Sequence, residues 1–464
     1  MAEVKLISLP YERTLARLYP AVQSLGYPIL LDSNHCSFPD TRWDILSAGP
    51  LATLSSYGES SHLEWHTSST PFELTPQANP MDTLSLLVEK VTSQAWSNNT
   101  SLPFNGGLLG YYGYEAGRYV EKLPETVIED VNLPTIMMGL YGWAVVSDHQ
   151  EKTTTLILTP WCQYHETDLI EQLRSHTQPS KSSFSLLQPF QANMSAQSYA
   201  ERFKKVKAYI DAGDCYQVNL TQRFSAPYEG DTWQAYLSLK DVCPTPFSAY
   251  LKLPDGRAIS SHSPERFILC DNGRIESKPI KGTRARGKNK LQDAALAEEL
   301  LSSEKDRAEN LMIVDLLRND LGKNCITGSV KVPILFGLES YANVHHMVST
   351  VEGKIAHKAD ALKVFQEGFP GGSITGAPKV RAMQIIDELE PHERSAYCGS
   401  FIYFGCNGQM DSSITIRTLV FDGQKAHCWA GGGLVADSVC EEEYQETFTK
   451  IGRLTHTLEK EFLR

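Results

Sequence analysis

Long apolar runs are missing from this 464-residue chain. No stretch of 18 consecutive apolar residues occurs, and the first 20 residues mix charged and apolar side chains without the apolar centre of an export signal. A helix needs about 20 mainly apolar residues to cross a bilayer. We therefore expect a protein that neither spans a membrane nor is exported.

Paired cysteines are absent as well. Ten cysteines are scattered along the chain, and none forms a Cys-x-x-Cys pair. Such pairs are typical of zinc sites and redox motifs, whereas isolated thiols are typical of reducing compartments. The sequence predicts reduced, mostly buried thiols in a cytoplasmic protein.

An excess of basic residues is the third absence. The net charge is −12, and the composition of 41% apolar and 21% charged residues is that of an ordinary globular protein. A general nucleic-acid partner would require a basic face, so none is expected. A small anionic substrate stays possible, because a local cluster of Arg and Lys can oppose the overall charge.

The chain also lacks internal repeats and a Gly-x-Gly-x-x-Gly turn after a strand. Strand and helix patterns alternate irregularly, which indicates an α+β protein. The clearest predicted strands and helices cover residues 153–158, 197–212, 247–251, 258–261, 291–301, 306–321, 412–420 and 441–463. A segment rich in Ser, Gln and Pro at 176–194 is the best linker candidate. We therefore expect an N-terminal region over 1–175 and a second region over 195–464.

Lys281 is the first candidate for chemistry. It lies in Pro279-Ile-Lys-Gly-Thr283, where a proline fixes the entry and a glycine permits a sharp exit. A lysine in such a turn can hold a phosphate, act as an amine nucleophile or simply be solvated. Taken alone, the stretch favours the solvated surface charge.

Two pairs of acidic residues form the second candidate. Asp306 and Glu309 begin one predicted helix, and Glu443 and Glu446 begin another. The i, i+3 spacing puts both carboxylates of a pair on one face, and four converging carboxylates would suit Mg²⁺. Acids in a first helical turn also complement the helix dipole, which is the simpler interpretation.

Further candidates follow downstream. Arg417 lies in the predicted strand 412–420 and would need a carboxylate partner if buried. The glycines of 431–433 offer backbone N–H groups to an anion, although a flexible turn is equally compatible. Lys450 has the spacing of a helical salt bridge with Glu446. One of the adjacent residues His345 and His346 could be a base, or both could be structural histidines. Glu265 could be a general acid or the ion-pair partner of Arg266.

Six ordered motifs give the chain a family resemblance. They are Ser263-Pro-Glu-Arg-Phe267, Pro279-Ile-Lys-Gly-Thr283, Asp306-Arg-Ala-Glu-Asn-Leu-Met-Ile-Val-Asp-Leu-Leu-Arg-Asn-Asp320, Phe369-Pro-Gly-Gly-Ser-Ile-Thr-Gly-Ala-Pro-Lys379, Thr415-Ile-Arg417 and Ala430-Gly-Gly-Gly-Leu-Val435. In this order they resemble the chorismate-utilising enzymes over residues 197–464, and more weakly over the N-terminal half.

The resemblance implies a fold and a metal. The fold would be two face-to-face β-sheets with helices packed outside, as in anthranilate synthase component I, with the N-terminal region interwoven. Mg²⁺ would be bound by Glu309 and Glu446, with Asp306 and Glu443 in its second shell.

It also implies a substrate site for chorismate. Glu265 would protonate the departing C4 hydroxyl, Lys281 would attack C2, and His346 would lie near the ring. The implied substrate contacts are Arg417, Tyr397, Gly432, Gly433, Lys450 and Thr375.

Two positions distinguish the branches of the family. Isochorismate and salicylate synthases have a water-activating lysine where this chain has Gln217, which cannot deprotonate water. Anthranilate synthases typically have alanine where this chain has Lys281. The chain is therefore similar to the branch that aminates chorismate at C4, toward 4-aminobenzoate and folate. Anthranilate synthase component I, which aminates C2 and then loses pyruvate, is the alternative.

No glutaminase nucleophile segment of the Gly-x-Cys-x-Gly type is present. The resemblance therefore implies ammonia from a separate glutaminase subunit, possibly in a transient heterodimer. Residues 30–33 and 244–248 resemble the family's tryptophan pocket, with Ser33, Pro246 and Phe247 as the candidate contacts. A tryptophan-binding regulatory protein on an inactive scaffold is the rival from another class, although the intact candidate site argues against it.

Overall fold

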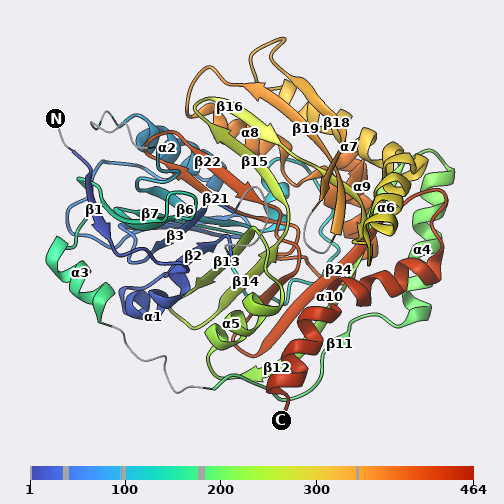
Figure 1. Ribbon diagram of the computed structural model, residues 1–464, viewed down its shortest axis with the longest axis horizontal. Coiled ribbons are helices and arrows are strands. Elements are labelled where there is room, and N and C mark those ends of the chain that lie inside the picture. Colours follow the sequence, from blue (N-terminus) through green and yellow to red (C-terminus); the bar gives the residue numbers. More distant parts are fainter. Residues whose placement is uncertain (1–2, 35–40, 95, 97–100, 176–182, 341–343) are drawn as a thin grey trace.

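Two large antiparallel β-sheets form the centre of the molecule (Figure 1). The computed structural model describes residues 3–34, 41–94, 96, 101–175, 183–340 and 344–464. In the described part, one sheet has 13 strands and the other has 11.

The larger sheet joins strands from both halves of the sequence. Its order is β1 (Lys5–Leu9), β9 (Thr153–Leu158), β8 (Trp143–Asp148), β3 (Trp43–Ser47), β2 (Ile29–Asp32), β13 (Phe247–Lys252), β14 (Ala258–Ser263), β23 (Thr418–Phe421), β24 (Lys425–Leu434), β12 (Gln217–Glu229) and β10 (Ser185–Leu186). Two short strands, β11 (Gln191–Ala192) and β20 (Gly376–Ala377), also pair with β12.

The smaller sheet also joins strands from both halves of the sequence. Its order is β17 (Ile280–Ala285), β19 (Val344–Lys354), β16 (Arg274–Ser277), β15 (Arg266–Asp271), β22 (Met410–Ser413), β21 (Ser400–Gly405), β6 (Gly107–Tyr112), β7 (Ile136–Tyr141), β4 (Ala52–Tyr57) and β5 (Ser60–Trp65). The additional strand β18 (Lys331–Ser340) pairs with β19.

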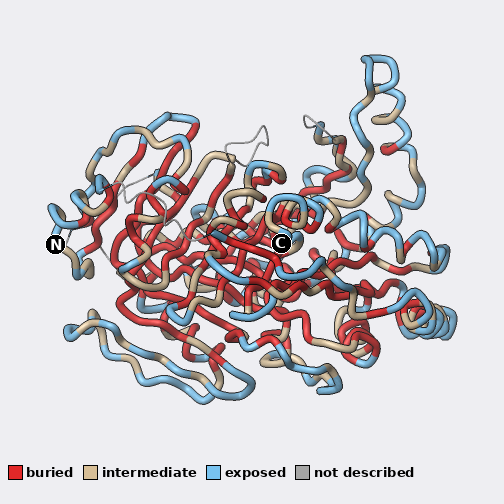
Figure 2. Tube along the Cα trace, turned by 90° about the horizontal axis from the view of Figure 1, so that it is seen from below, coloured by how far each residue is buried: buried red, intermediate tan, exposed pale blue. Residues whose placement is uncertain are grey.

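The main core lies between the two sheets. Ile29 and Ile45 of the larger sheet belong to the same buried cluster as Leu54 and Leu108 of the smaller one. Neighbouring residues such as Leu30 face the opposite way, into a second buried cluster under the outer helices. This alternation is what a strand buried on both faces requires. Figure 2 shows the buried strands in the interior, with exposed segments around them.

Ten α-helices and four short 3₁₀ helices cover the sheets in the described part of the chain. The α-helices are α1 (Tyr19–Val22), α2 (Pro80–Thr92), α3 (Glu166–Arg174), α4 (Ala196–Asp211), α5 (Thr232–Val242), α6 (Lys290–Ser302), α7 (Glu304–Gly322), α8 (Asp360–Gly368), α9 (Lys379–Leu389) and α10 (Cys440–Phe462). The 3₁₀ helices are η1 (Leu15–Arg17), η2 (Gln23–Leu25), η3 (Tyr114–Tyr119) and η4 (Gly372–Ile374). Among the described helices, none combines the length and apolar content needed to cross a membrane.

The expected fold class is confirmed, and most predicted elements agree within a few residues. Helix α4 begins after Ser195, whose side chain accepts a hydrogen bond from the Ser198 amide, and Gly213 follows it with φ of 81°. These are the expected N-cap and terminating glycine.

The predicted strand 412–420 is wrong as a single element. It is split into β22 and β23, and Arg417 lies at the bend between them with φ of 53°. This left-handed conformation interrupts the alternation of a strand. Arg417 is exposed as a result.

The proposed division at 176–194 stays a prediction. Residues 176–182 lie outside the described part, and the rest of that segment contains β10 and β11, which pair with β12. Strands β2 and β6 of the N-terminal region pair with β13 and β21 of the second region. The N-terminal half therefore contributes to both sheets.

Candidate functional site

Lys281 lies on β17, next to the first turns of helix α7. Gly282 has φ of 80°, and the register against β19 shifts between Ile280 and Thr283. A Cβ atom on Gly282 would lie 2.9 Å from the Asp306 Cγ atom. Glycine therefore lets the lysine's strand approach the helix that carries the predicted metal ligands.

The surroundings of the Lys281 amine are mainly acidic. Burial lowers its pKa, while the charges of Glu309 and Glu265 act in the opposite direction. Lys450 adds to the lowering and Glu446 opposes it. The fold thus gathers five predicted site residues, from three of the motifs and from helix α10, around the Lys281 amine.

Glu265 and Lys281 are connected through one residue of η4. The Ser373 hydroxyl donates a hydrogen bond to Glu265 Oε1 at 3.1 Å, and its carbonyl accepts one from Lys281 Nζ at 3.4 Å. Burial raises the pKa of Glu265 to about 7, against the charge of Lys281. A carboxyl group that keeps its proton near neutral pH is suited to general acid catalysis.

The predicted metal ligands come from α7 and α10. Burial raises the pKa of Glu309, and the negative charges of Asp306 and Glu446 add to the effect. Glu446 also forms an ion pair of 2.7 Å with Lys450. In the described chain no group of three or more His, Cys, Asp or Glu side chains is placed to hold a metal. Helices α7 and α10 therefore each offer one carboxylate, and they do not form a complete set of protein ligands for a metal.

The other acid of each predicted pair, Asp306 and Glu443, already has a protein partner. Asp306 forms an ion pair of 3.1 Å with Arg284. Glu443 is buried and accepts a hydrogen bond of 2.6 Å from the Ser438 hydroxyl. A Cβ atom on Gly432 would lie 2.7 Å from Glu443 Oε2, so a side chain there would displace the Glu443 carboxylate.

His346, on the neighbouring strand β19, lies within electrostatic reach of Arg417. His346 on β19 is opposite Thr283, and its Nδ1 atom is 2.8 Å from the threonine hydroxyl. Burial lowers the pKa of His346 to about 4, and the positive charge of Arg417 adds to the effect. The imidazole is therefore neutral at physiological pH.

Gly433 is packed against a side chain that has no partner. A Cβ atom at Gly433 would lie 2.8 Å from Gln217 Nε2. Gln217 is fully buried, and neither of its amide atoms has a hydrogen-bond partner among the described residues. Buried polar groups are normally satisfied, so a ligand or water is expected there. Sequence reasoning used Gln217 only to exclude a water-activating base.

Tyr397 and Thr375 are buried in the same region. The Tyr397 ring stacks on Trp429 with centroids 6.0 Å apart. The Thr375 hydroxyl donates to the Gly371 carbonyl at 2.9 Å, so its side chain is already engaged within the loop. Both residues are buried rather than on the open surface.

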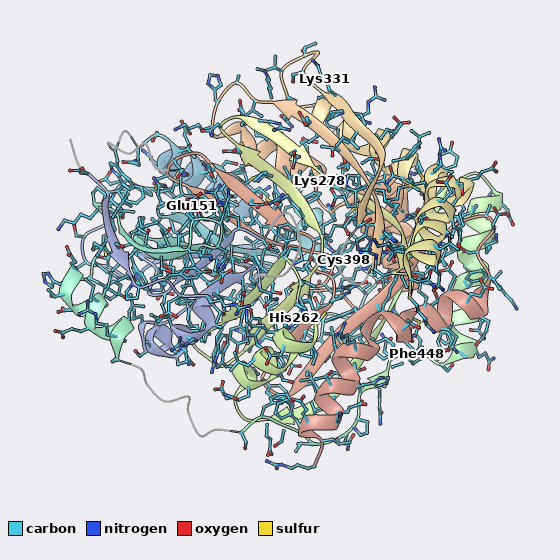
Figure 3. The ribbon with its side chains drawn as sticks, in the orientation of Figure 1. Glu151, His262, Lys278, Lys331, Cys398 and Phe448 are labelled. Atoms are coloured by element: carbon cyan, nitrogen blue, oxygen red, sulfur yellow. The ribbon has the colours of Figure 1, made fainter. Side chains whose placement is uncertain are left out.

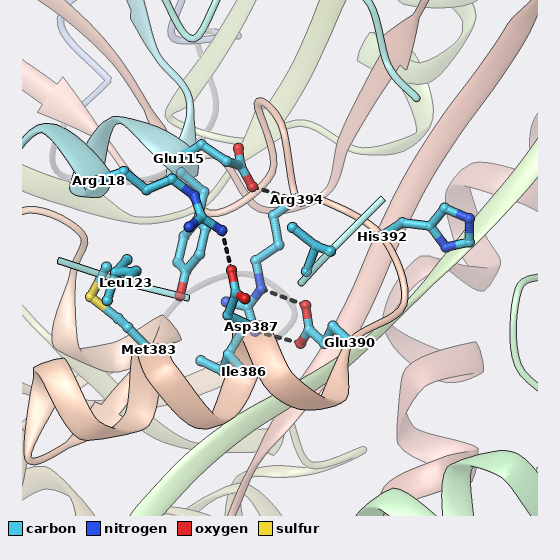
Figure 4. A pocket seen from close by; sticks show the side chains of 11 residues that line it. Glu115, Arg118, Leu123, Met383, Ile386, Asp387, Glu390, His392 and Arg394 are labelled. Carbon is cyan, nitrogen blue, oxygen red and sulfur yellow. Dashed lines mark hydrogen bonds and ion pairs between the residues drawn. The ribbon is translucent and has the colours of Figure 1, made fainter. Parts of the chain in front are cut away.

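A small pocket lies behind this loop and contains none of the predicted site residues (Figure 4). Arg394 holds it together through an ion pair of 2.7 Å with Glu390. Its guanidinium also donates to the carbonyls of Ile374 at 2.9 Å and Asn219 at 2.7 Å. Arg394 therefore holds the backbone next to Thr375 in place through these hydrogen bonds. Sequence reasoning missed this buried residue and missed Ser373, although Ser373 lies within a quoted motif.

The predicted tryptophan segments also lie next to each other. Strand β2 pairs with β13, and the Ser33 amide and hydroxyl both donate to Asp44 Oδ1 at 2.8 Å. Phe247 is covered by the guanidinium of Arg266 at 4.9 Å from its ring centroid. Pro246 immediately precedes β13. Tryptophan binding stays a prediction.

Known proteins resemble this chain over nearly its full length. The family of chorismate binding enzymes matches residues 29–456. Aminodeoxychorismate synthase component 1 of Escherichia coli is 45% identical over 457 residues, covering 98% of both chains. The protein of that name from Bacillus subtilis is 38% identical over 79% of this chain and 80% of its own. Anthranilate synthase component 1 of Thermus thermophilus is 36% identical, with coverage of 82% and 83%.

Solved structures agree on the fold. Anthranilate synthase component I from Streptococcus pneumoniae superposes with a TM-score of 0.76 at 29% identity, covering 90% of this chain and 93% of its own. The menaquinone-specific isochorismate synthase from Escherichia coli has the same fold, with a TM-score of 0.72 at 16% identity and coverage of 99% and 95%. The resemblance seen in the sequence motifs is thus confirmed, and the chain belongs to the family of chorismate binding enzymes.

Proposed function

We propose that this chain is the chorismate-aminating subunit of an aminodeoxychorismate synthase. It would replace the C4 hydroxyl of chorismate by an amino group, giving 4-amino-4-deoxychorismate for 4-aminobenzoate and folate synthesis. The observation that carries the proposal is the connection of Lys281 and Glu265 through Ser373. An amine whose pKa is lowered by burial, beside a carboxyl whose pKa is raised to about 7, suits an amine nucleophile paired with an acid. Full-length relatives that carry this enzyme's name support it.

Arg417 is proposed to bind the pyruvyl carboxylate of chorismate. Its guanidinium is exposed and forms no ion pair in the described structure, so it is available to an anion. Tyr397, Thr375 and the backbone at Gly432 and Gly433 are proposed as the remaining contacts around the substrate. Lys450 lies close enough to add positive charge, since it already influences Glu265.

Glu309 and Glu446 are proposed to hold Mg²⁺. Two carboxylates from different helices, whose mutual repulsion raises the pKa of Glu309, fit a hard divalent cation that keeps water and substrate oxygens as its other ligands. When bound, the ion would neutralise the ring carboxylate of chorismate. Asp306 and Glu443 would orient the site, because Arg284 and Ser438 already engage them.

The first chemical step would use both members of the Lys281–Glu265 pair. The neutral amine of Lys281 forms a bond to C2, both double bonds of the ring diene shift by one position, and the C4–O bond breaks. Glu265 gives its proton to the departing oxygen, which leaves as water. The ring is then held on Lys281 as a secondary ammonium.

The second step would return the double bonds to their original pattern. Ammonia forms a bond to C4, both double bonds shift back, and the C2–N bond breaks so that Lys281 leaves as a neutral amine. The new C4 ammonium gives a proton to the Glu265 carboxylate, which restores the acid. The net change is chorismate plus ammonia to aminodeoxychorismate plus water. His346, neutral because the pKa of its ring is lowered to about 4, would orient the ring by hydrogen bonding.

A glutaminase subunit is proposed as the source of ammonia. The relatives are named component 1, and this chain contains no Gly-x-Cys-x-Gly nucleophile segment. We also propose a cytoplasmic location, since all nine cysteines in the described part are free thiols. Bound tryptophan at Ser33, Pro246 and Phe247 is proposed as a further ligand, on the family resemblance.

Product analysis tests the proposal against its alternatives. Purified chain is incubated with chorismate, ammonium and Mg²⁺, and the products are identified by mass. A product that keeps the enolpyruvyl group with nitrogen at C4 is expected. Anthranilate and pyruvate would show C2 amination instead, and unchanged chorismate would favour the tryptophan-binding regulatory protein.

Lys281→Ala tests the covalent step. The variant should lose at least about a hundredfold in C4 amination, because the covalent route accounts for the reaction. Its residual product should shift toward C2 amination, because free ammonia can then attack C2 directly. Lys281→Arg is the matched control, since it keeps the positive charge without a nucleophilic amine and should be equally slow. C4 amination at the parent rate in Lys281→Ala would make the lysine a spectator.

A further inference from the structure

Strand β18 is an exposed edge of the smaller sheet. It pairs with β19 and with no other strand of the described chain. It is 10 residues long, and none of its residues is buried. Lys331 and Pro333 protect its beginning, but residues 334–338 carry no charge. A long edge strand with an uncharged apolar centre is a site at which another chain can pair or pack.

Four apolar side chains on β18 and on the neighbouring helix α7 are partly exposed to solvent. The exposed fractions are 50% for Ile334, 45% for Leu335, 37% for Leu338 and 44% for Leu311. We call these four residues the β18 patch. Single exposed apolar residues are ordinary, but a group of them on adjoining elements is typical of a protein interface.

The β18 patch is held rigidly against α7. Phe336 adopts a left-handed φ of 58°, and the Arg307 guanidinium lies 4.7 Å from the centre of its ring. The Phe336 amide donates to the Ser349 hydroxyl at 3.0 Å, and that hydroxyl donates to Asn310 Oδ1 at 2.5 Å. A bulky residue in this conformation is strained, and it persists only where its surroundings fix it. The patch is therefore a built surface rather than a frayed edge.

The β18 patch lies next to the candidate site. On β19, His346 is opposite Thr283 of β17 on one side and Glu339 of β18 on the other. Neighbouring strands are about 4.8 Å apart, so β18 runs roughly 10 Å from the strand that carries Lys281. In Figure 3, Lys331 marks the outer end of β18, and Lys278 precedes β17.

A basic segment precedes helix α6, and three of its side chains, Lys278, Arg284 and Arg286, are paired with Glu339, Glu299 and Asp293. Residues 278–290 contain six basic and no acidic side chains, while the whole chain has a net charge of −12. Lys288 and Lys290 are exposed and have no ion-pair partner in the described structure. They lie at the start of α6, which packs against β18. An apolar patch with basic side chains beside it is complementary to an apolar surface with an acidic rim.

We propose that the β18 patch is the docking surface of the ammonia-supplying glutaminase subunit. This rests on the proposed function, which requires ammonia to reach C4 of a substrate held beside Lys281. A partner on β18 would release ammonia within a few strand widths of that amine. Its contact face would be apolar at the centre and acidic at the rim.

The test compares charged substitutions on two edge strands. Leu335→Asp and Leu338→Asp place a carboxylate in the β18 patch. Leu6→Asp is the matched control, because Leu6 is 46% exposed on the other edge strand, β1, of the larger sheet. The full-length variants are mixed with the purified glutaminase subunit of the same organism. Binding is measured by calorimetry, and turnover is measured with glutamine and, separately, with ammonium.

The two patch variants should bind the glutaminase at least about tenfold more weakly and lose glutamine-dependent turnover in proportion. Ammonium-dependent turnover should be unchanged, which shows that the variants fold, and Leu6→Asp should behave as the parent. Unchanged binding in both patch variants would overturn the proposal. So would a self-associating parent chain that Leu335→Asp converts to monomers, since the patch would then bind a second copy. A parent that binds glutaminase but produces no amine from ammonium would refute the proposed function and leave the docking surface intact.

Discussion

At the scale of single residues, burial shifts the pKa of Glu265 and of Lys281 more than the charge of the other residue does. Burial raises the pKa of the acid and lowers that of the amine, although their opposite charges act the other way. Desolvation therefore outweighs attraction within this pair. The consequence is a larger share of the neutral acid and neutral amine, which are the two forms that the proposed first step consumes.

The pH profile of turnover should report on Glu265. Its pKa of about 7 predicts that ammonium-dependent turnover falls as the pH rises above neutrality, because the acid form disappears. Glu265→Gln should be slower by a factor of about 10² to 10⁴ and should lose this alkaline dependence. Steady-state rates between about pH 5.5 and 9 at saturating chorismate would measure both effects.

The pH dependence of the free energy of unfolding tests the raised pKa of Glu265 independently of turnover. Its usual pKa of 4.5 is raised to about 7 by burial, so the folded state binds more protons than the unfolded state between these values. Its contribution to stability therefore falls as the pH rises through this window. Glu265→Gln should unfold like the parent near pH 4 and gain up to about 3 kcal/mol over it near pH 8. Equal stability at both pH values would mean that Glu265 is ionised in the folded protein.

At the scale of elements, helix α10 packs against β24, and helix α7 packs against β17 and β19. Each brings one carboxylate: Glu309 of α7 forms no ion pair in the described structure, and Glu446 of α10 pairs with Lys450. The charge of Glu446 adds to the burial that raises the pKa of Glu309, so an added cation should relieve a repulsion that already exists. This favours a metal site shared between two helices over a salt bridge that happens to be nearby.

Glu446→Ala should weaken Mg²⁺ binding at least about tenfold, and chorismate binding should weaken with it. The two affinities are coupled because the ring carboxylate needs the charge of the ion. Titration with Mn²⁺, followed by electron paramagnetic resonance, measures the metal without turnover. Glu442→Ala, one turn away on the exposed face of α10, is the control and should bind as the parent does. Equal Mn²⁺ affinity in the two variants would contradict the assignment of Glu446.

The end of β24 makes a second prediction at this scale. Gly433→Ala would place a Cβ atom 2.8 Å from the Gln217 amide and push that side chain out of its buried position. We expect the KM for chorismate to rise at least about tenfold with little loss of fold, because Gln217 has no protein partner to lose. Gly322→Ala is the control, since its Cβ would meet no atom within 4 Å. A parent-like KM in Gly433→Ala would place the substrate elsewhere.

Local patterns predicted single elements well and failed where the chain bends for a local reason. The alternating residues 153–158 form β9 with the predicted bounds, because the period-2 pattern of a half-buried strand can be recognised from its own residues alone. The prediction of one strand over 412–420 was wrong because Arg417 adopts a left-handed conformation, which arginine does not normally favour and which the sequence therefore does not indicate. Ser373 was missed for a similar reason: its contacts to Glu265 and Lys281 are made by a 3₁₀ turn whose position is set by packing.

At the scale of the whole molecule, the site's roles were predictable only from the family resemblance. Spacing along the sequence could pair Asp306 with Glu309, but it could not bring α7 to α10. Long-range strand pairing does this, and nothing in the local pattern of either helix encodes it. The polar interior around Arg394 depends on the same pairing, since its contacts reach residues as far apart in sequence as Asn219 and Glu390.

Because both sheets mix the two halves of the chain, we expect the molecule to unfold as one unit. Residues 1–175 alone would leave β2 without β13 and β6 without β21, which exposes two apolar strand edges in the middle of the main core. This fragment should therefore aggregate or stay unfolded when expressed alone, and co-expression with residues 183–464 should restore a folded complex. Circular dichroism and urea unfolding would measure this, with a single transition expected for the intact chain. A fragment that unfolds cooperatively by itself would show instead that the N-terminal region is an independent domain, and that the pairing seen between β2 and β13 is a docking contact rather than a condition for folding.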